Sequence, residues 1–160
     1  MQLAVAAGAQ VIGAARGSRK LELVRELGAK GAVDYSEPDW TEQVRALTGK
    51  GPDVVFDGVG GQIGRAALEI TGPGGRFSAH GATSGAPTVT EPAGDVTVIG
   101  IEQLFDFAAT ARPRVEQALA EAVAGRLRPV IGQTFPLARA ADAHAAIEAR
   151  AVTGKTLLLT

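Results

Sequence analysis

Short strand-like runs alternate with helix-like runs along this 160-residue chain, and the connections between them are short and contain glycine. The strand-like runs are nearly continuously apolar, which is typical of parallel strands covered on both faces. This alternation predicts an α/β fold, a doubly wound parallel sheet with right-handed crossover helices. The predicted strands are residues 10–14, 31–34, 53–57, 76–79, 96–101, 130–135 and 155–160.

Helical spacing and terminal residues predict the helices between these strands. Ser18 and Ser36 precede two of the helices as N-cap residues, and Gly28 ends the first of these two. The chain begins inside a helical run that Gly8 ends, with no capping signal before it. After this first helical run, the predicted helices cover residues 18–27, 37–47, 62–70, 113–124 and 139–149.

Composition limits the classes of function. The chain has no cysteine and only two histidines, His80 and His144, so we expect no disulfide and no metal site. The net charge of -1 gives no electrostatic argument for binding nucleic acid or an anionic membrane. Since no run resembles a membrane span or a secretory signal, we expect a cytoplasmic protein. The length predicts one domain over residues 1–160.

A glycine-rich turn, residues 58–61, follows the strand 53–57. Its spacing departs from the dinucleotide-binding pattern G-x-G-x-x-G, because Ile63 stands at the third glycine position and no acidic residue ends a strand about 20 residues later. Two interpretations remain open at this point: a tight turn after a buried strand, and a pyrophosphate loop. Asp57, at the end of the strand, is expected to have a structural hydrogen-bonding role.

Four segments of the chain together resemble the cofactor domain of medium-chain dehydrogenases/reductases, and in particular the zinc-independent quinone oxidoreductase branch. The resemblance covers nearly the whole chain and implies a Rossmann-like domain that binds NADP(H) and takes part in hydride transfer to a quinone or enone. The segments are VAAGAQVIGAA through RKLELVRELGAKGAVDYSEPDW, GPDVVFDGVGG, GPGGRFSAHGATSG, and GRLRPVIGQTFPLARAADAHAAIEARAVTGKTLLL.

Family members carry a barrel-like substrate domain and a first Rossmann strand with its glycine-rich loop ahead of the helix in which Met1 falls. The resemblance therefore implies a domain truncated at its N-terminus, without its central strand. Strands 10–14 and 53–57 would then face a gap, unless they close up and pair or a partner supplies a strand. We expect that a reductase of this kind needs missing sequence or a partner; the alternative is a non-catalytic remnant that self-associates or binds nucleotide weakly.

No acidic residue follows the strand 10–14, where NAD-preferring domains bind the ribose 2′-hydroxyl. Arg16, Ser18 and Lys20 stand there instead, and these side chains suit a 2′-phosphate beside a helix N-terminus. Lys20 and Tyr35 match residues that line this pocket in the family, whereas Arg16 replaces a small hydroxyl residue. NADP(H) is thus expected over NAD(H); the alternative is a solvated, basic helix start.

The resemblance also assigns the two later strand ends to the nicotinamide half of the cofactor. It places a turn of small residues beside the nicotinamide, and it places the segment after strand 76–79 against the nicotinamide and its ribose. No catalytic residue is expected, because hydride chemistry belongs to the cofactor. The assigned residues are Gly58, Val59 and Gly60 on the first segment, and His80, Gly81, Thr83 and Ser84 on the second.

The strand 96–101 carries a prediction about partners. In the family a strand at this position pairs with its twin across a two-fold axis, so the resemblance implies a homodimer through residues 96–101. The alternative is an ordinary strand of the sheet. A flavodoxin-like signalling domain is a weaker possibility for the whole chain, since it would need an acidic cluster at the strand ends and only Asp57 stands there.

Overall fold

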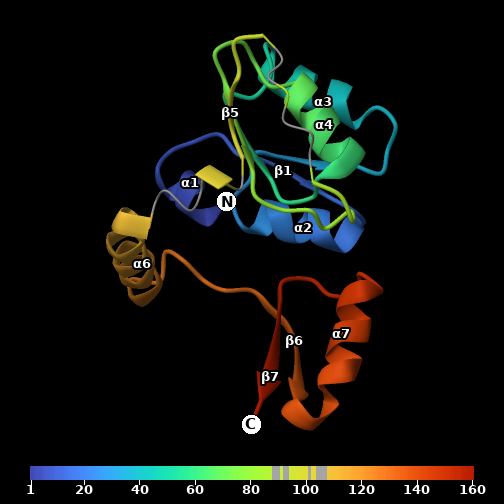
Figure 1. Ribbon diagram of the computed structural model, residues 1–160, viewed down its shortest axis with the longest axis vertical. Coiled ribbons are helices and arrows are strands. Elements are labelled where there is room, and N and C mark those ends of the chain that lie inside the picture. The colour runs from blue at the N-terminus through green and yellow to red at the C-terminus, as the bar shows by residue number, and fades with distance from the viewer. Residues whose placement is uncertain (88–90, 92–93, 101, 104–107) are drawn as a thin grey trace.

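In the described part of the chain, seven strands form parallel ladders and alternate with helices, as a computed structural model shows (Figure 1). The structure describes residues 1–87, 91, 94–100, 102–103 and 108–160. Every strand ladder in this part is parallel, which confirms the predicted Rossmann-like α/β class. The ladders join β1 (Ile12–Ala15) to β2 (Gly31–Asp34), then β3 (Val54–Asp57) to β4 (Arg76–Ala79) and β4 to β5 (Thr97–Ile99), and finally β6 (Ile131–Pro136) to β7 (Lys155–Leu159).

The sheet is open between β1 and β3. Within the described residues no ladder joins these two strands, so they do not close up and pair with each other. On β3, Phe56 is 73% exposed and Val54 is 40% exposed, whereas a central parallel strand buries both of its faces. The gap expected between strands 10–14 and 53–57 is therefore present.

Helices alternate with the strands along the chain in the predicted order. β1 is followed by α2, β2 by α3, and β3 by α4, each helix returning the chain to the start of the next parallel strand. A single 3₁₀ turn, Leu137–Arg139, leads into the last helix. The helices are α1 (Gln2–Ala6), α2 (Ser18–Glu26), α3 (Trp40–Thr48), α4 (Gly61–Glu69), α6 (Ala108–Val123) and α7 (Ala140–Glu148).

The predicted start of α3 is wrong, and so are the predicted N-cap residues of α2 and α3. Gly17, not Ser18, is the N-cap of α2. α3 begins at Trp40 rather than at residue 37, because Ser36 caps no helix; its backbone N–H and its hydroxyl both donate to Asp34 Oδ1. The side chain expected to start a helix instead closes a turn around the preceding carboxylate.

Boundaries elsewhere also differ. α6 begins before Pro113, which lies inside the helix rather than at its start. The strand predicted at residues 96–101 is observed at Thr97–Ile99, and its last predicted residue, Ile101, lies outside the described residues. The strand predicted at residues 10–14 is shifted to Ile12–Ala15.

Two clusters of buried apolar side chains hold together the part of the molecule that contains β2–β5, α3 and α4. The first joins β2, α3 and the end of α4; the second lies between α4 and the sheet β3–β4–β5. The first cluster comprises Val33, Trp40, Val44 and Ile70, and the second comprises Leu68, Phe77, Ala79 and Val96.

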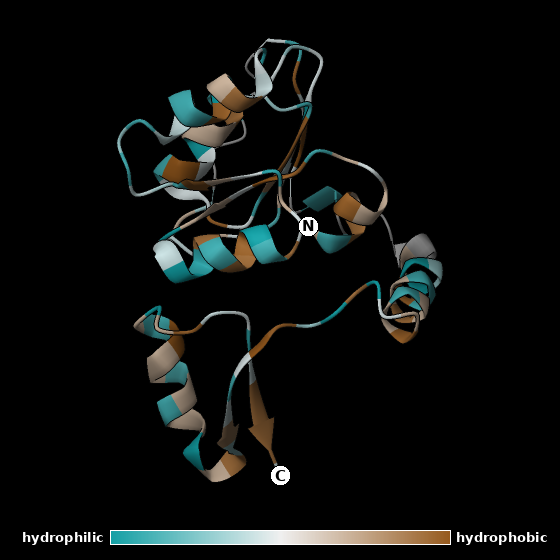
Figure 2. Cartoon of the chain, turned by 180° about the vertical axis from the view of Figure 1, so that it is seen from behind, coloured by the Kyte–Doolittle hydropathy of each residue, from teal (hydrophilic) through white to brown (hydrophobic). Residues whose placement is uncertain are grey.

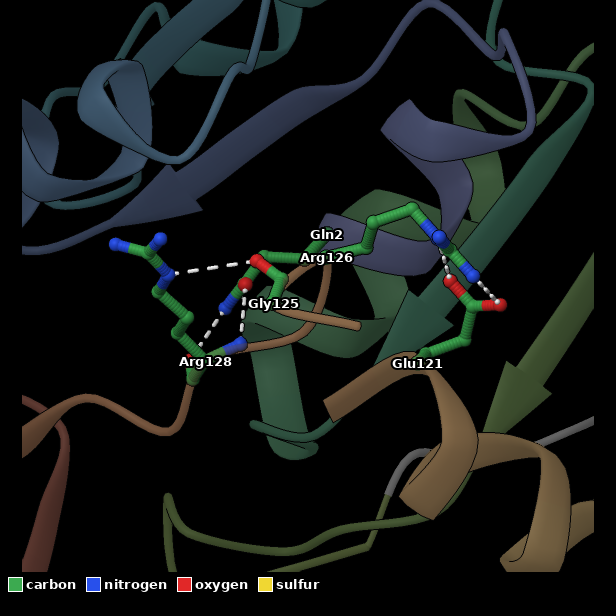
Figure 3. Close-up of polar contacts among 5 residues, drawn as sticks. All are labelled: Gln2, Glu121, Gly125, Arg126 and Arg128. Atoms are coloured by element: carbon green, nitrogen blue, oxygen red, sulfur yellow. Dashed lines mark hydrogen bonds and ion pairs between the residues drawn. The ribbon is translucent and has the colours of Figure 1, made fainter. Parts of the chain in front are cut away.

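The last third of the chain forms a second packing unit, in which α7 lies against β6 and β7 (Figure 1). Gln2 of α1 is bonded to the segment that leads into this unit: its Nε2 donates to Arg128 O and its Oε1 accepts from Arg128 N, both at 2.8 Å (Figure 3). β7 keeps three exposed leucines, at residues 157–159 (Figure 2). No helix in the described ranges is both long and apolar enough to span a membrane.

Two phenylalanines on neighbouring strands test this packing. Phe77 is fully buried and Phe56 is 73% exposed. Phe77→Ala should lower the free energy of unfolding by about 3–5 kcal/mol, because it leaves a cavity in the second cluster. Phe56→Ala, the matched control, should change it by less than about 1 kcal/mol. Urea unfolding followed by circular dichroism measures both, and equal losses would contradict the buried position of Phe77.

Candidate functional site

A pocket of about 530 Å³ lies at the carboxyl ends of β1 and β2. All four residues predicted around a 2′-phosphate line it: Arg16 follows β1, Ser18 and Lys20 stand in the first turn of α2, and Tyr35 follows β2. The structure therefore brings these four residues together. The remaining lining residues are Gly17, Arg19, Glu148, Ala149, Arg150, Ala151 and Thr153.

Asp34, a residue that the sequence analysis did not assign to the site, shapes the near wall of this pocket. Its Oδ2 accepts from Gly17 N at 2.8 Å and its Oδ1 accepts from Ser36 N at 2.9 Å. The hydrogen bond from the Ser36 side chain is the main cause that lowers the pKa of Asp34 below 3.8, and the charge of Arg16 also lowers it. The carboxylate thus fixes the glycine between β1 and α2, with Arg16 beside it.

The far wall of the pocket comes from the end of α7, more than a hundred residues later in the chain. Lys20 Nζ donates to Arg150 O at 3.3 Å, which ties α2 to this wall. Arg16, Arg19, Lys20 and Arg150 give the lining four positive charges against the one negative charge of Glu148. The lining therefore carries net positive charge. Its wall at residues 148–153 was missed because nothing local in the sequence signals so distant a contact.

The other predicted residues form two loops that pack on each other at the carboxyl ends of β3 and β4. Thr83 Oγ1 donates to Gly58 O at 3.1 Å, and Ser84 N donates to Val59 O at 2.8 Å. A β-carbon at Gly81 would lie 2.4 Å from Gly58 O, so only glycine allows this approach of the two backbones.

Asp57 organises the first of these loops from inside the protein. It is 5% exposed, and its Oδ1 accepts from Val59 N at 2.9 Å and from Gly60 N at 3.0 Å. These contacts confirm the structural hydrogen-bonding role expected for Asp57. Gly60 is the N-cap of α4, so the same carboxylate sets the turn from β3 into that helix.

His80 and Ser84 lie at the outer side of the second loop. His80 is exposed, its Nδ1 is 3.3 Å from Ser78 O, and its ring meets the ring of Phe56 edge to face with centroids 6.3 Å apart. Ser84 borders a further pocket of about 510 Å³ beside the first turn of α4. The predicted residues therefore gather in two places, and Arg150 connects them, since its Nη2 donates to Thr83 O at 2.9 Å.

The residues do not fit a zinc ion. Among the residues the structure places, no group of three or more His, Cys, Asp or Glu side chains could hold a metal. The full sequence has no cysteine, so the thiolate ligands common in zinc sites are absent.

Parallel strand ladders that alternate with helices, and a positively charged pocket where a strand meets a helix N-terminus, are typical of a Rossmann-like domain, the class that binds dinucleotides at this edge of the sheet. Residues 1–123 match the family model described as zinc-binding dehydrogenase. The chain belongs to this family, within the medium-chain dehydrogenase/reductase superfamily and its quinone oxidoreductase-like branch.

Known relatives agree with this assignment. The chain is 35% identical over 169 residues to a quinone oxidoreductase of Pseudomonas aeruginosa (99% of this chain, 51% of the relative) and 34% identical over 164 residues to a 2-haloacrylate reductase of a Burkholderia species (95% and 48%). A mycobacterial protein solved in complex with NADPH superposes with a TM-score of 0.85 at 30% identity, covering 99% of this chain and 51% of that one. The chain spans about half the length of the curated relatives that it matches.

The hydrogen bonds that Asp34 accepts from Gly17 and Ser36 predict that the stability of the fold depends on pH. A carboxyl whose pKa is lowered on folding adds stability at pH values above its ordinary pKa of 3.8, and that contribution is lost as the pH falls through the lowered value. Ser36→Ala should move the pKa of Asp34 upward toward 3.8, because it removes the largest cause of the shift. Carbon-13 NMR titration of the Asp34 carboxyl measures this; Ser18→Ala is the control and should leave it in place. An Asp34 pKa that Ser36→Ala leaves unaltered would contradict the hydrogen bond between these two side chains.

Proposed function

We propose that this chain is the NADP(H)-binding part of a zinc-independent, quinone oxidoreductase-like reductase. The observation that carries the proposal is the cationic pocket at the start of α2, with Arg16, Ser18, Lys20 and Tyr35 on its wall. The cofactor supplies the hydride, and this chain's residues bind and orient it. We propose residues 1–160 as one nucleotide-binding domain.

The donor set of the pocket suits a 2′-phosphate. Arg16 offers a planar guanidinium and Lys20 a compact ammonium, and α2 directs its positive N-terminal end toward the same space. Asp34, the nearest strand-end acid, bonds Gly17 and Ser36 and is not part of the lining. A carboxylate so engaged is not the acid that would select the free 2′-hydroxyl of NAD(H). The NADPH complex of the mycobacterial relative supports the same preference.

The two packed loops are proposed to bind the other half of the cofactor. Gly58, Val59 and Gly60 would lie beside the nicotinamide, where small residues allow close backbone approach. His80, Gly81, Thr83 and Ser84 would contact the nicotinamide and its ribose. The bonds between the loops, from Thr83 Oγ1 to Gly58 O and from Ser84 N to Val59 O, support their acting as one surface.

Hydride transfer to a quinone or enone is proposed for the whole reductase. The names of the relatives, a quinone oxidoreductase and a 2-haloacrylate reductase, support an electron-poor alkene or quinone as acceptor. Because this chain spans about half of each relative, we propose that the reaction needs residues from further sequence or from a partner. The alternative is a non-catalytic chain that self-associates or binds nucleotide weakly, and the gap between β1 and β3 favours this alternative for the chain alone.

Lys20→Ala tests the phosphate pocket. Removing a charged donor to the 2′-phosphate should weaken NADPH binding about tenfold or more and change NADH binding little. Lys30→Ala is the matched control, since Lys30 donates to Gln10 Oε1 away from the pocket. Isothermal titration calorimetry measures the four affinities. Equal losses for NADPH and NADH would remove the 2′-phosphate from the proposal, and no binding of either nucleotide near millimolar concentration would remove the cofactor.

We also propose that the chain forms a homodimer through β5, which is the last strand of its sheet in the described ranges. Thr97 N donates to Gly75 O beside β4, so the backbone groups of Val98, one residue on, point to the free edge. An edge of this kind pairs with a second strand.

Val98→Pro tests the dimer, because proline removes the outward N–H and leaves the bond from Thr97 to Gly75 in place. Sedimentation velocity should show a dimer for the unaltered chain and mainly monomer for the variant. A monomeric unaltered chain, or a variant that still dimerises, would exclude pairing through β5.

A further inference from the structure

Arg150 occupies a backbone position that other helices of this chain give to glycine. α1, α2 and α6 each end with the same pair of backbone hydrogen bonds, and the residue in the left-handed conformation is Gly8, Gly28 and Gly125 respectively. α7 ends with the same pair: Arg150 N donates to Ile147 O at 2.9 Å and Ala151 N donates to Ala146 O at 3.1 Å. Arg150 has a φ of 54°, where residues with a β-carbon are disfavoured.

In this conformation, both the backbone carbonyl and the guanidinium of Arg150 form hydrogen bonds to distant segments. Its carbonyl accepts from Lys20 Nζ at 3.3 Å, and its Nη2 donates to Thr83 O at 2.9 Å. Thr83 in turn donates through Oγ1 to Gly58 O at 3.1 Å. One residue at the end of α7 is thus bonded to the first turn of α2 and to the loop after β4, and through that loop to the turn after β3.

These three segments belong to parts of the molecule that no strand ladder joins in the described residues. β1–β2, β3–β4–β5 and β6–β7 are separate ladders in the described part of the chain. The pocket lies beside the first ladder, the two packed loops lie at the end of the second, and α7 belongs to the third. Arg150, at the end of α7, is hydrogen-bonded to α2 beside the pocket and to the loop after β4.

We propose that Arg150 is a positioning residue that fastens the loop 81–84 to the far wall of the cationic pocket, so that the two halves of the nucleotide site are held in one arrangement. The proposal rests on the proposed function for its ligand, but its structural part does not need the ligand. It explains why an arginine stands where the backbone favours glycine.

Arg150→Gly distinguishes the attachment of the loop 81–84 from the stability of the fold, because it removes the bond to Thr83 and keeps a residue suited to the left-handed backbone. Glycine suits the left-handed position, so the midpoint of thermal unfolding should stay the same or rise. The amide hydrogen of Ser84, which reports attachment of the loop to Val59, should exchange at least about fivefold faster in the ligand-free chain. Arg126→Gly is the matched control: it removes an exposed arginine that follows α6 and bonds Glu121 (Figure 3), and it should leave Ser84 exchange unchanged.

Two further variants keep the test decisive if Arg150→Gly disturbs the fold. Arg150→Asn tolerates the left-handed backbone and cannot reach as far, so it should also speed Ser84 exchange. Arg150→Lys keeps a long donor that can reach toward Thr83 O and should restore part of the protection. Unchanged Ser84 exchange in both the glycine and the asparagine variant would overturn the proposal.

Binding of a short and a long ligand tests the coupling of the two halves. Adenosine 2′,5′-bisphosphate carries the pocket-binding end alone, whereas NADPH also reaches the loops. Arg150→Gly should reduce the advantage of NADPH over the bisphosphate by about tenfold. Equal losses for both ligands would overturn the coupling and leave Arg150 as a contact of the pocket alone. Failure of the unaltered chain to bind either ligand would count against the proposed function, while Ser84 exchange would still decide the fastening.

Discussion

The hydrophobic contact between β2, α3 and the end of α4 is the interaction on which the arrangement of this molecule depends. Val33, Trp40, Val44 and Ile70 bury their side chains together, and Ile63 packs against them from α4. No ladder in the described residues joins β1 to β3, so backbone pairing does not align the two parts of the sheet there. Side-chain burial does so instead, and it brings the carboxyl ends of β1, β2, β3 and β4 to the same edge.

The candidate site uses that edge with little buried charge. Asp34 and Asp57 each end a strand, and each bonds backbone N–H groups of the turn beside it. One carboxylate fixes the entry to α2 and the other fixes the entry to α4, so both helices begin at a defined place. Positive charge is left to exposed or half-buried side chains around the pocket, where a phosphate can replace water.

The sequence predicted most of what local pattern controls. Strands 31–34 and 76–79 have the predicted bounds, and the glycines that end α1 and α2 stand where expected. The start of α3 was wrong because Asp34 binds Ser36, a competition that capping preferences do not resolve. The near wall of the pocket could be predicted because its residues stand at the junction of β1 with α2 and directly after β2. Its far wall did not, because Lys20 and Arg150 are 130 residues apart and meet only through tertiary packing.

The open edges of β1 and β3 also bear on how the chain behaves in a concentrated solution. An apolar strand with unpaired backbone groups is a template for any extended chain, including another copy of itself. The exposed side chains of Phe56 and Val54 add apolar surface beside the hydrogen-bonding groups of this edge. Self-association of the chain through this edge would therefore compete with the proposed pairing of β5. A charged residue or a proline within the strand would have protected such an edge, and β3 carries neither before its terminal Asp57.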